Sequence, residues 1–109
     1  MSAGRRPARF ILTVLAREDV LSIQRYLAAE SVEISGRVGG APEEAFEGLA
    51  RAPGLGHFRE DLADRRHKFF RVFRYLVIYR WESRPLEIVR VLHASRDVEA
   101  ILRGGDPEK

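Results

Sequence analysis

Arginine is the residue whose number and placement in this sequence could do chemistry. The chain carries 19 Lys or Arg against 16 Asp or Glu, a formal net charge of +3. Between Arg59 and Arg96 there are ten Lys or Arg and five Asp or Glu, so the excess of positive charge lies in this segment. Nearly all of these cations are Arg, whose planar guanidinium binds carboxylates and phosphates through two hydrogen bonds. The segment therefore suits an acidic peptide or a nucleic acid, and its charge does not choose between them.

The other residues give little support for a metal site or a disulfide. The chain has no cysteine, which excludes a disulfide and a thiolate metal site and favours a reducing compartment. Its three histidines, His57, His67 and His93, lack the i, i+4 spacing with which two residues of one helix hold a metal ion. We therefore expect no metal site and no cofactor.

An apolar run near the N-terminus, FILTVLA at residues 10–16, is the nearest approach to a targeting or membrane segment. Arg17, Glu18 and Asp19 follow it directly. The run is too short for a signal sequence and far short of the roughly 20 apolar residues of a membrane span. We expect a cytoplasmic protein.

The elements that must position the arginines begin with a strand and two helical patterns. Arg9–Leu15 is apolar without clean alternation, which favours a strand buried on both faces, as in the interior of a sheet. Glu18–Glu30 has apolar residues at helical spacing, and a second helical pattern covers Glu33–Ala50. Gly39 and Pro42 interrupt the second pattern, so we expect a kink, or two short helices with a fresh start at the proline.

Three runs rich in Phe, Val, Ile and Tyr follow, at Lys68–Phe73, Leu76–Trp81 and Leu86–His93. Only short turns separate them, which predicts antiparallel neighbours in a meander. Ser95 is a suitable N-cap for a final short helix that ends near Leu102. The order β-α-α-β-β-β-α predicts one α+β domain, with helices packed on one face of a four-stranded sheet and an ordered core from about residue 9 to 103.

Three runs in this order carry a resemblance to a known family: PGLGHFREDL from Pro53, FFRVFRYLVIYRW from Phe69 and LEIVRVLHASRDVEAIL from Leu86. With EDVLSIQRYLAAES and EEAFEGLARAPGLG upstream, they resemble the ParE branch of the ParE/RelE superfamily, toxins of type II toxin–antitoxin modules, from Arg9 to Leu102. The resemblance implies a cognate antitoxin of the ParD type with a ribbon-helix-helix part that binds the operator. Its C-terminal segment would wrap the toxin in a hetero-oligomer. ParE-like members poison DNA gyrase, whereas RelE-like members are ribosome-dependent endoribonucleases.

A nuclease of this kind needs an acid, a base and cations for the charge that builds on phosphate. Arg71, Arg90 and His93 are the residues that a RelE-like nuclease would use here. Histidine is the only residue type among these three whose ordinary pKa lies near neutrality. His93 could equally be packed at the end of a strand and hydrogen-bonded to a backbone group. Arg90 is either a functional cation or a sheet-face arginine paired with a carboxylate. After Arg96 no Tyr, His or Lys occurs before Lys109, so we predict a gyrase inhibitor without catalytic residues and keep the nuclease as the alternative.

The partners are expected to bind the basic residues of the C-terminal half, while the helical hairpin offers an apolar groove to the antitoxin. Tyr75, Tyr79 and Trp81 could stack on bases, but the alternation of Val77, Tyr79 and Trp81 favours core packing. A third hypothesis, prompted by the interruption at Pro42, is a degenerate toxin that still binds its antitoxin. The predicted partner-binding residues are Arg65, Arg66, Lys68, Arg71, Arg74 and Arg96.

Overall fold

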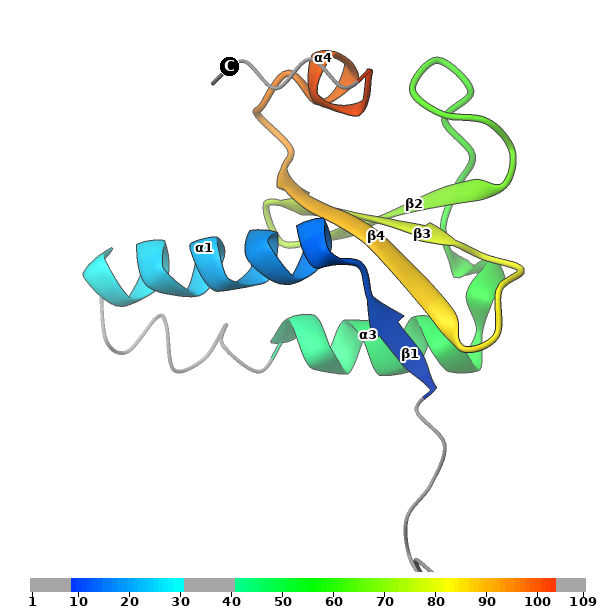
Figure 1. Cartoon of the computed structure of the whole chain (residues 1–109), viewed down its shortest axis with the longest axis horizontal. Helices are drawn as coiled ribbons and strands as arrows, with labels where there is room; N and C mark the ends of the chain where they lie inside the picture. Colours follow the sequence, from blue (N-terminus) through cyan, green and yellow to red (C-terminus); the bar gives the residue numbers. More distant parts are fainter. Residues whose placement is uncertain (1–8, 31–40, 104–109) are drawn as a thin grey trace, which may run out of the picture.

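The computed structural model describes residues 9–30 and 41–103 (Figure 1). The elements in chain order are β1 (Phe10–Leu12), α1 (Val14–Glu30), α3 (Ala41–Arg51), the 3-10 turn η1 (Pro53–Leu55), β2 (His67–Val72), β3 (Tyr75–Arg80), β4 (Leu86–His93) and α4 (Val98–Leu102). This order confirms the predicted α+β class, with a meander followed by a short helix. Within the described ranges, no helix has the length and apolar character that crossing a membrane requires.

The sheet has the strand order β1-β4-β3-β2, with β1 parallel to β4 and the other neighbours antiparallel. β1 pairs Phe10 with Leu86 and Leu12 with Ile88, and it lies at the edge of the sheet. The prediction of an interior strand was therefore wrong. Only three residues of the apolar run are strand, and they are not buried on both faces, because Ile11 is exposed between two half-buried neighbours.

Thr13 ends the first strand and starts the first helix. Its hydroxyl accepts a hydrogen bond from the N–H of Ala16 at 3.0 Å, and its carbonyl accepts one from Arg17 at 2.9 Å. A threonine at this position pairs N–H groups that the first turn of a helix leaves without partners. The helix consequently begins at Val14, earlier than predicted, and takes Leu15 out of the predicted strand.

The helix that was predicted to start afresh at the proline is α3. It begins at Ala41, has Pro42 beside its first residue, and carries Glu43 and Glu44 in its first turn. Proline is tolerated there because the first N–H groups of a helix need no intrahelical partner, and acids at this end suit the helix dipole. The earlier part of the predicted pattern, residues 33–40, lies outside the described residues.

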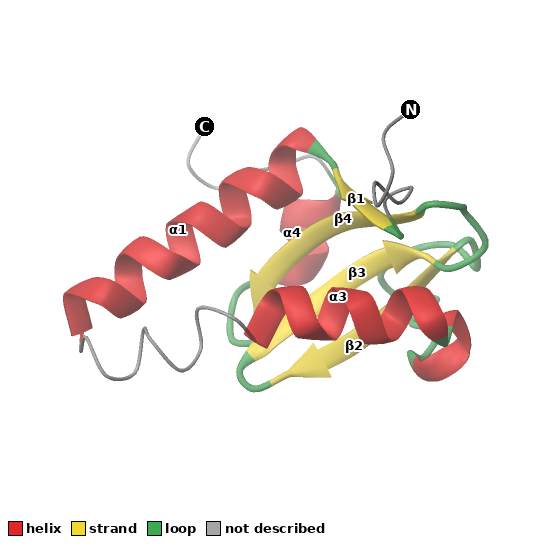
Figure 2. Cartoon of the chain, turned by 90° about the horizontal axis from the view of Figure 1, so that it is seen from below, coloured by secondary structure: helices red, strands yellow, loops and turns green. Residues whose placement is uncertain are grey.

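The larger hydrophobic cluster lies between the sheet and the two longer helices, α1 and α3 (Figure 2). Val77 and Tyr79 of β3 point into it, together with Ala16 of α1 and with Phe46 and Leu49 of α3. All five side chains are at most 1% exposed. This face agrees with the predicted packing of helices against the sheet.

The opposite face of the sheet is covered as well, by α4 (Figure 1). Ile78 and Leu92 belong to a second buried cluster with Phe69 of β2 and with Val98 and Ile101 of α4. Because neighbouring residues of a strand point to opposite faces, the apolar side chains between those of the first cluster need a cover of their own. The prediction that helices pack on one face was thus wrong for α4.

Asp97 is the N-cap of α4, since its Oδ1 accepts a hydrogen bond from the N–H of Ala100 at 3.2 Å. The predicted cap, Ser95, does not have this role. Its hydroxyl instead lies 2.7 Å from Nδ1 of His93. Both residue types are good caps, so composition could not decide between them.

Candidate interaction surface

The six residues predicted to bind partners occupy two ends of the sheet and form no single cluster. The start of β2 carries Arg65, Arg66 and Lys68. Arg71 lies near the other end of β2, and Arg74 lies in the turn between β2 and β3. Arg96, which follows β4, belongs with the second group because the N–H of Ala94 donates to the carbonyl of Arg74 at 2.8 Å. The length of β2 separates the two groups.

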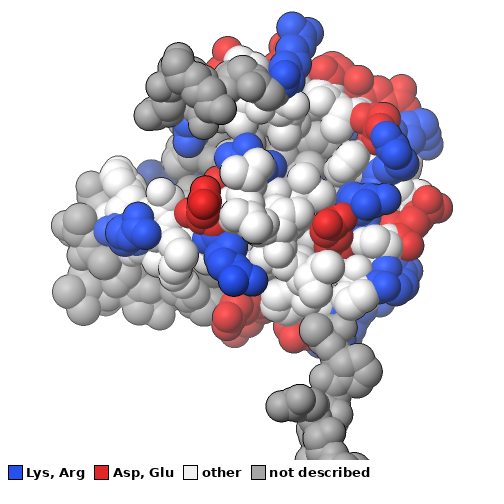
Figure 3. Space-filling view, viewed as in Figure 1, with Lys and Arg blue, Asp and Glu red and all other residues white. Residues whose placement is uncertain are grey.

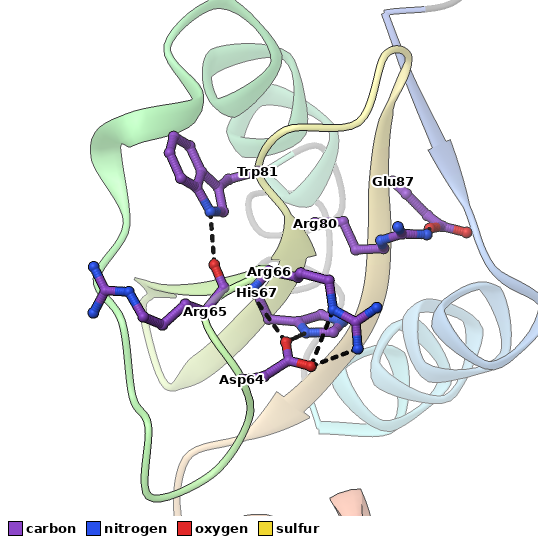
Figure 4. A network of polar contacts seen from close by, with 7 residues as sticks. All are labelled: Asp64, Arg65, Arg66, His67, Arg80, Trp81 and Glu87. Atoms are coloured by element: carbon purple, nitrogen blue, oxygen red, sulfur yellow. Dashed lines mark hydrogen bonds and ion pairs between the residues drawn. The ribbon is translucent and has the colours of Figure 1, made fainter.

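The two arginines before β2 have carboxylate partners within the chain, and Figure 4 shows that of Arg66. Arg66 donates from Nη2 and Nε to Asp64 Oδ2 at 2.7 and 3.1 Å, and His67 Nδ1 lies 3.0 Å from Asp64 Oδ1. Hydrogen bonds from Arg66 and then from His67 hold the pKa of the Asp64 carboxyl well below its ordinary range. Arg65 pairs with Glu60. Figure 3 shows the same mixing of the two signs of charge over one face of the molecule.

Lys68 is engaged with the chain itself. Its Nζ lies 4.5 Å from the ring centroid of Phe58 and 5.0 Å from that of Trp81, distances typical of cation–π contacts. The same ammonium donates to the carbonyls of Gly54 and Gly56 at 3.3 and 3.4 Å. Lys68 therefore fastens the segment after α3 to the sheet.

The turn between β2 and β3 exposes an aromatic ring beside cations. Phe73 is 70% exposed and has a φ of 61°, in the left-handed region that costs a bulky residue about 1–2 kcal/mol. Arg71 Nε donates to the Phe73 carbonyl at 2.9 Å. Within the described part of the chain, no hydrogen bond or ion pair holds the exposed guanidinium of Arg74 or Arg96. We call Arg71, Phe73, Arg74 and Arg96 the hairpin end.

His93 lies next to the hairpin end and is bonded to the backbone. Its Nδ1 accepts a hydrogen bond from the N–H of Ser95 at 3.1 Å, and its ring meets that of Tyr75 edge to face at a centroid distance of 5.3 Å. Burial raises the pKa of the Tyr75 hydroxyl, and the neighbouring Tyr26 of α1 adds to the shift. This geometry matches the interpretation of His93 as a histidine packed at the end of a strand.

Arg90 is the second residue of the nuclease hypothesis, and it is paired with a carboxylate. Its Nε donates to Asp19 Oδ2 at 2.8 Å and its Nη2 to Asp19 Oδ1 at 3.0 Å. The two side chains are 16% and 13% exposed. Arg71, the third residue of that hypothesis, lies on β2, with β3 between it and β4. Arg90 therefore faces α1 as a structural cation, apart from Arg71.

A β-bulge interrupts the regular alternation of β4 next to Arg90. Ile78 pairs with Arg90, whereas the next residue of β3, Tyr79, pairs with Ile88. One residue of β4 is thus extra, and the alternation of faces is broken there. Ile88 packs in the cluster under α1 and α3, while Leu92 packs under α4, although residues four apart in a regular strand share a face.

Tyr79 of β3 and Trp81, which follows this strand, pack as the alternation predicted. Tyr79 is buried, donates its hydroxyl to the carbonyl of Pro53 at 2.7 Å and accepts from the N–H of Gly56 at 2.9 Å. Trp81 is half-buried, and its indole N–H donates to the carbonyl of Arg65 at 3.0 Å (Figure 4). These rings are committed to the fold and form no open platform for bases.

Several apolar side chains are exposed along α1, and we call them the α1 row. They were not predicted as a surface from the sequence. The exposed residues are Val14, Leu15, Leu21 and Tyr26, with Ile11 of β1 nearby in sequence. Val14 is 73% and Tyr26 60% exposed. The sequence spacing contained a signal for this surface, because Val14 and Leu21 are seven residues apart and share one side of the helix. Val20 and Ile23 meet the core on a different side.

Fold and surface define a small α+β protein that presents a cationic hairpin and an exposed apolar helix. In the ranges 9–30 and 41–103 there is no cluster of His, Cys, Asp and Glu that could hold a metal ion. A family model described as ParE toxin of type II toxin–antitoxin system, parDE, matches residues 10–98. The chain belongs to this family of toxins, which partner with an antitoxin. Comparison with curated proteins gives no match.

Proposed function

We propose that this toxin inhibits DNA gyrase in the cytoplasm and that a cognate antitoxin neutralises it. The ion pair between Arg90 and Asp19 is the observation that carries the proposal. A nuclease would need the cation of Arg90 on the phosphate, but the guanidinium is bound by a carboxylate and largely buried. Family membership supports the toxin class, and the engaged state of Arg90 and His93 favours inhibition by binding over RNA cleavage.

The mechanism follows from differential binding. A toxin that binds the gyrase–DNA complex more tightly after cleavage than before it shifts the population toward cleaved DNA. No reaction of the toxin's own side chains is required. The hairpin end, with its exposed cations, is our candidate for the contact with this complex.

The antitoxin is proposed to bind α1. An amphipathic segment of a partner binds well to an apolar helical surface, and the row of Val14, Leu15, Leu21 and Tyr26 offers such a surface. We expect a ribbon-helix-helix antitoxin of the ParD type, in a hetero-oligomer with the toxin. Its binding part would carry apolar residues at helical spacing.

Purified gyrase and a translating extract together test the proposed target. The toxin, produced without its antitoxin, should leave gyrase trapped on cleaved DNA and leave translated mRNA intact. Cleavage of mRNA on the ribosome with normal supercoiling would favour the RelE-like alternative that uses Arg71, Arg90 and His93. Absence of both effects would favour the degenerate toxin.

Charge placed on the α1 row tests the antitoxin surface. Leu21→Lys should abolish binding of the antitoxin while gyrase inhibition persists, because the charge lies on the solvent side of α1. Leu55→Lys is the matched control, since Leu55 is also an exposed leucine but lies in η1. Equal loss of antitoxin binding in both variants would argue against a surface on α1.

A further inference from the structure

We propose that the hairpin end binds double-stranded DNA directly, with its three arginines on phosphates and Phe73 against the bases. The inference extends the proposed function and rests on it for its biological meaning, since it names the DNA of the gyrase complex as a partner of the toxin. The binding itself needs no gyrase. It can therefore be tested separately.

Charge is the first argument for a polyanionic partner. The sequence has no Asp or Glu from residue 65 to 81 or from residue 88 to 96, the stretches that build the hairpin end. The nearest acid after Arg96 in the chain is Asp97, and its carboxylate accepts the hydrogen bond that caps α4. Among residues 9–30 and 41–103, no partner holds the guanidinium groups of Arg74 and Arg96, so they can pair with phosphates, in contrast to Arg66 at the other end of β2.

The second argument is the residue at the turn. Only two residues, Phe73 and Arg74, join the paired ends of β2 and β3. The positive φ of Phe73 is a conformation for which short hairpin turns normally use Gly, Asn or Asp. Phenylalanine gains little burial here that would offset the strain, because the residue is 70% exposed. An exposed ring held among cations can contact base edges in a groove, such as the methyl group of thymine, or enter between two base pairs.

Shape distinguishes duplex DNA from other polyanions. A two-stranded β-ribbon fits the major groove of B-DNA, whereas the major groove of an RNA duplex is too deep and narrow for side chains to enter. The hairpin end is a convex turn, and acidic peptides are usually held in grooves or along sheet edges. The observations therefore favour a DNA duplex over double-stranded RNA and over an acidic protein segment.

Binding of the full-length toxin to a DNA duplex of about two helical turns, without gyrase, measures the proposed contact. Three phosphate contacts predict that log K falls with log salt concentration with a slope of about −2.7. Arg74→Gln should weaken binding and reduce the size of this slope by about one. Phe73→Asn should weaken binding about tenfold and leave the slope unchanged, because the apolar contact of an uncharged ring releases no counterions. Phe73→Trp should retain affinity.

Matched controls separate the surface from general effects of charge and folding. Arg51→Gln removes an exposed arginine from the end of α3, and Leu55→Asn removes an exposed apolar side chain from η1. Both should bind DNA like the wild type. Phe73→Asn should fold normally, because asparagine accepts a positive φ more readily than phenylalanine does.

Several results would overturn the proposal. The first is absence of DNA binding by the wild type, and the second is an equal loss of DNA affinity in the control variants. The third is binding of an RNA duplex or of polyglutamate that is equally tight and also depends on Phe73. Gyrase inhibition without DNA binding would remove this inference and leave the proposed function standing. DNA binding without gyrase inhibition would do the reverse.

Discussion

Asp19 of α1 accepts hydrogen bonds from both the guanidinium of Arg90 and the N–H of Val91, so one carboxylate fastens the first helix to the central strand β4. Removal of either member of a largely buried pair leaves the other charge without its partner, which costs about 3 kcal/mol or more. We expect Asp19→Ala to lower the free energy of unfolding by about that amount, measured by urea denaturation. Arg90→Met should destabilise by a similar amount, because it leaves the Asp19 carboxylate without its cation although methionine fills the space of the stem.

A double-mutant cycle separates the pair from its surroundings. Asp19→Asn and Arg90→Met together should destabilise less than the sum of the single changes, with a coupling of about 1–3 kcal/mol. If Arg90→Met instead kept the stability of the wild type but lost toxicity, Arg90 would be a functional cation and the nuclease hypothesis would regain support.

Gly56 lies where any side chain would collide with the sheet. A Cβ built on it would be 2.5 Å from the hydroxyl of Tyr79 and 2.8 Å from the carbonyl of Phe69. Gly56→Ala should therefore destabilise the protein by about 2–3 kcal/mol in thermal or urea unfolding. Gly48→Ala is the control, because nothing lies within 4 Å of the added methyl group and alanine is the better helix former, so it should stabilise α3 by about 0.5–1 kcal/mol. Equal effects in the two variants would contradict this assignment.

Much of the sheet was predictable from the sequence because its signals are local. The strand of residues 86–93 was predicted with the bounds that β4 has, and the other two meander strands within one residue. Tyr79 was correctly assigned to the core from its alternation with Val77. The same local information cannot reveal which strand lies at an edge, so β1 was misplaced.

The candidate surface was less predictable, because it depends on distant pairings. Arg65, Arg66 and Lys68 lie in the same dense group of cations along the sequence as Arg71 and Arg74, so all five were predicted to bind partners. The first three already interact with carboxylates or aromatic rings of the chain itself. The bulge that directs Arg90 toward α1 is a property of the pairing of β3 with β4. Neither could be deduced from spacing along one strand.

The lowered pKa of the Asp64 carboxyl should make a small part of the stability sensitive to acid. Its pKa is lowered in the folded protein by Arg66 and His67, so the unfolded chain takes up its proton first as the pH falls. The contribution is present at neutral pH and is lost below about pH 4, as the carboxylate becomes protonated. An NMR titration should find the Asp64 pKa below that of Asp61, whose single arginine partner also lowers its pKa, and Arg66→Gln should raise it. An unchanged Asp64 pKa in Arg66→Gln would exclude this cause.

The raised pKa of Tyr79 should make the stability of the fold decrease at alkaline pH. Burial raises the pKa of its hydroxyl above the ordinary value near 10, although the hydrogen bond from Gly56 N–H acts the other way. The unfolded chain therefore loses this proton first, and stability that is complete below about pH 10 should fall as the pH rises through the folded-state pKa. Tyr79→Phe should be less stable at neutral pH by about 2 kcal/mol, because the N–H of Gly56 and the carbonyl of Pro53 lose their partner. Its stability should also fall less steeply between neutral and alkaline pH than that of the wild type, with Tyr75→Phe as the comparison for the half-buried ring. Parallel pH profiles of wild type and Tyr79→Phe in urea unfolding would show that Tyr79 does not control the alkaline transition.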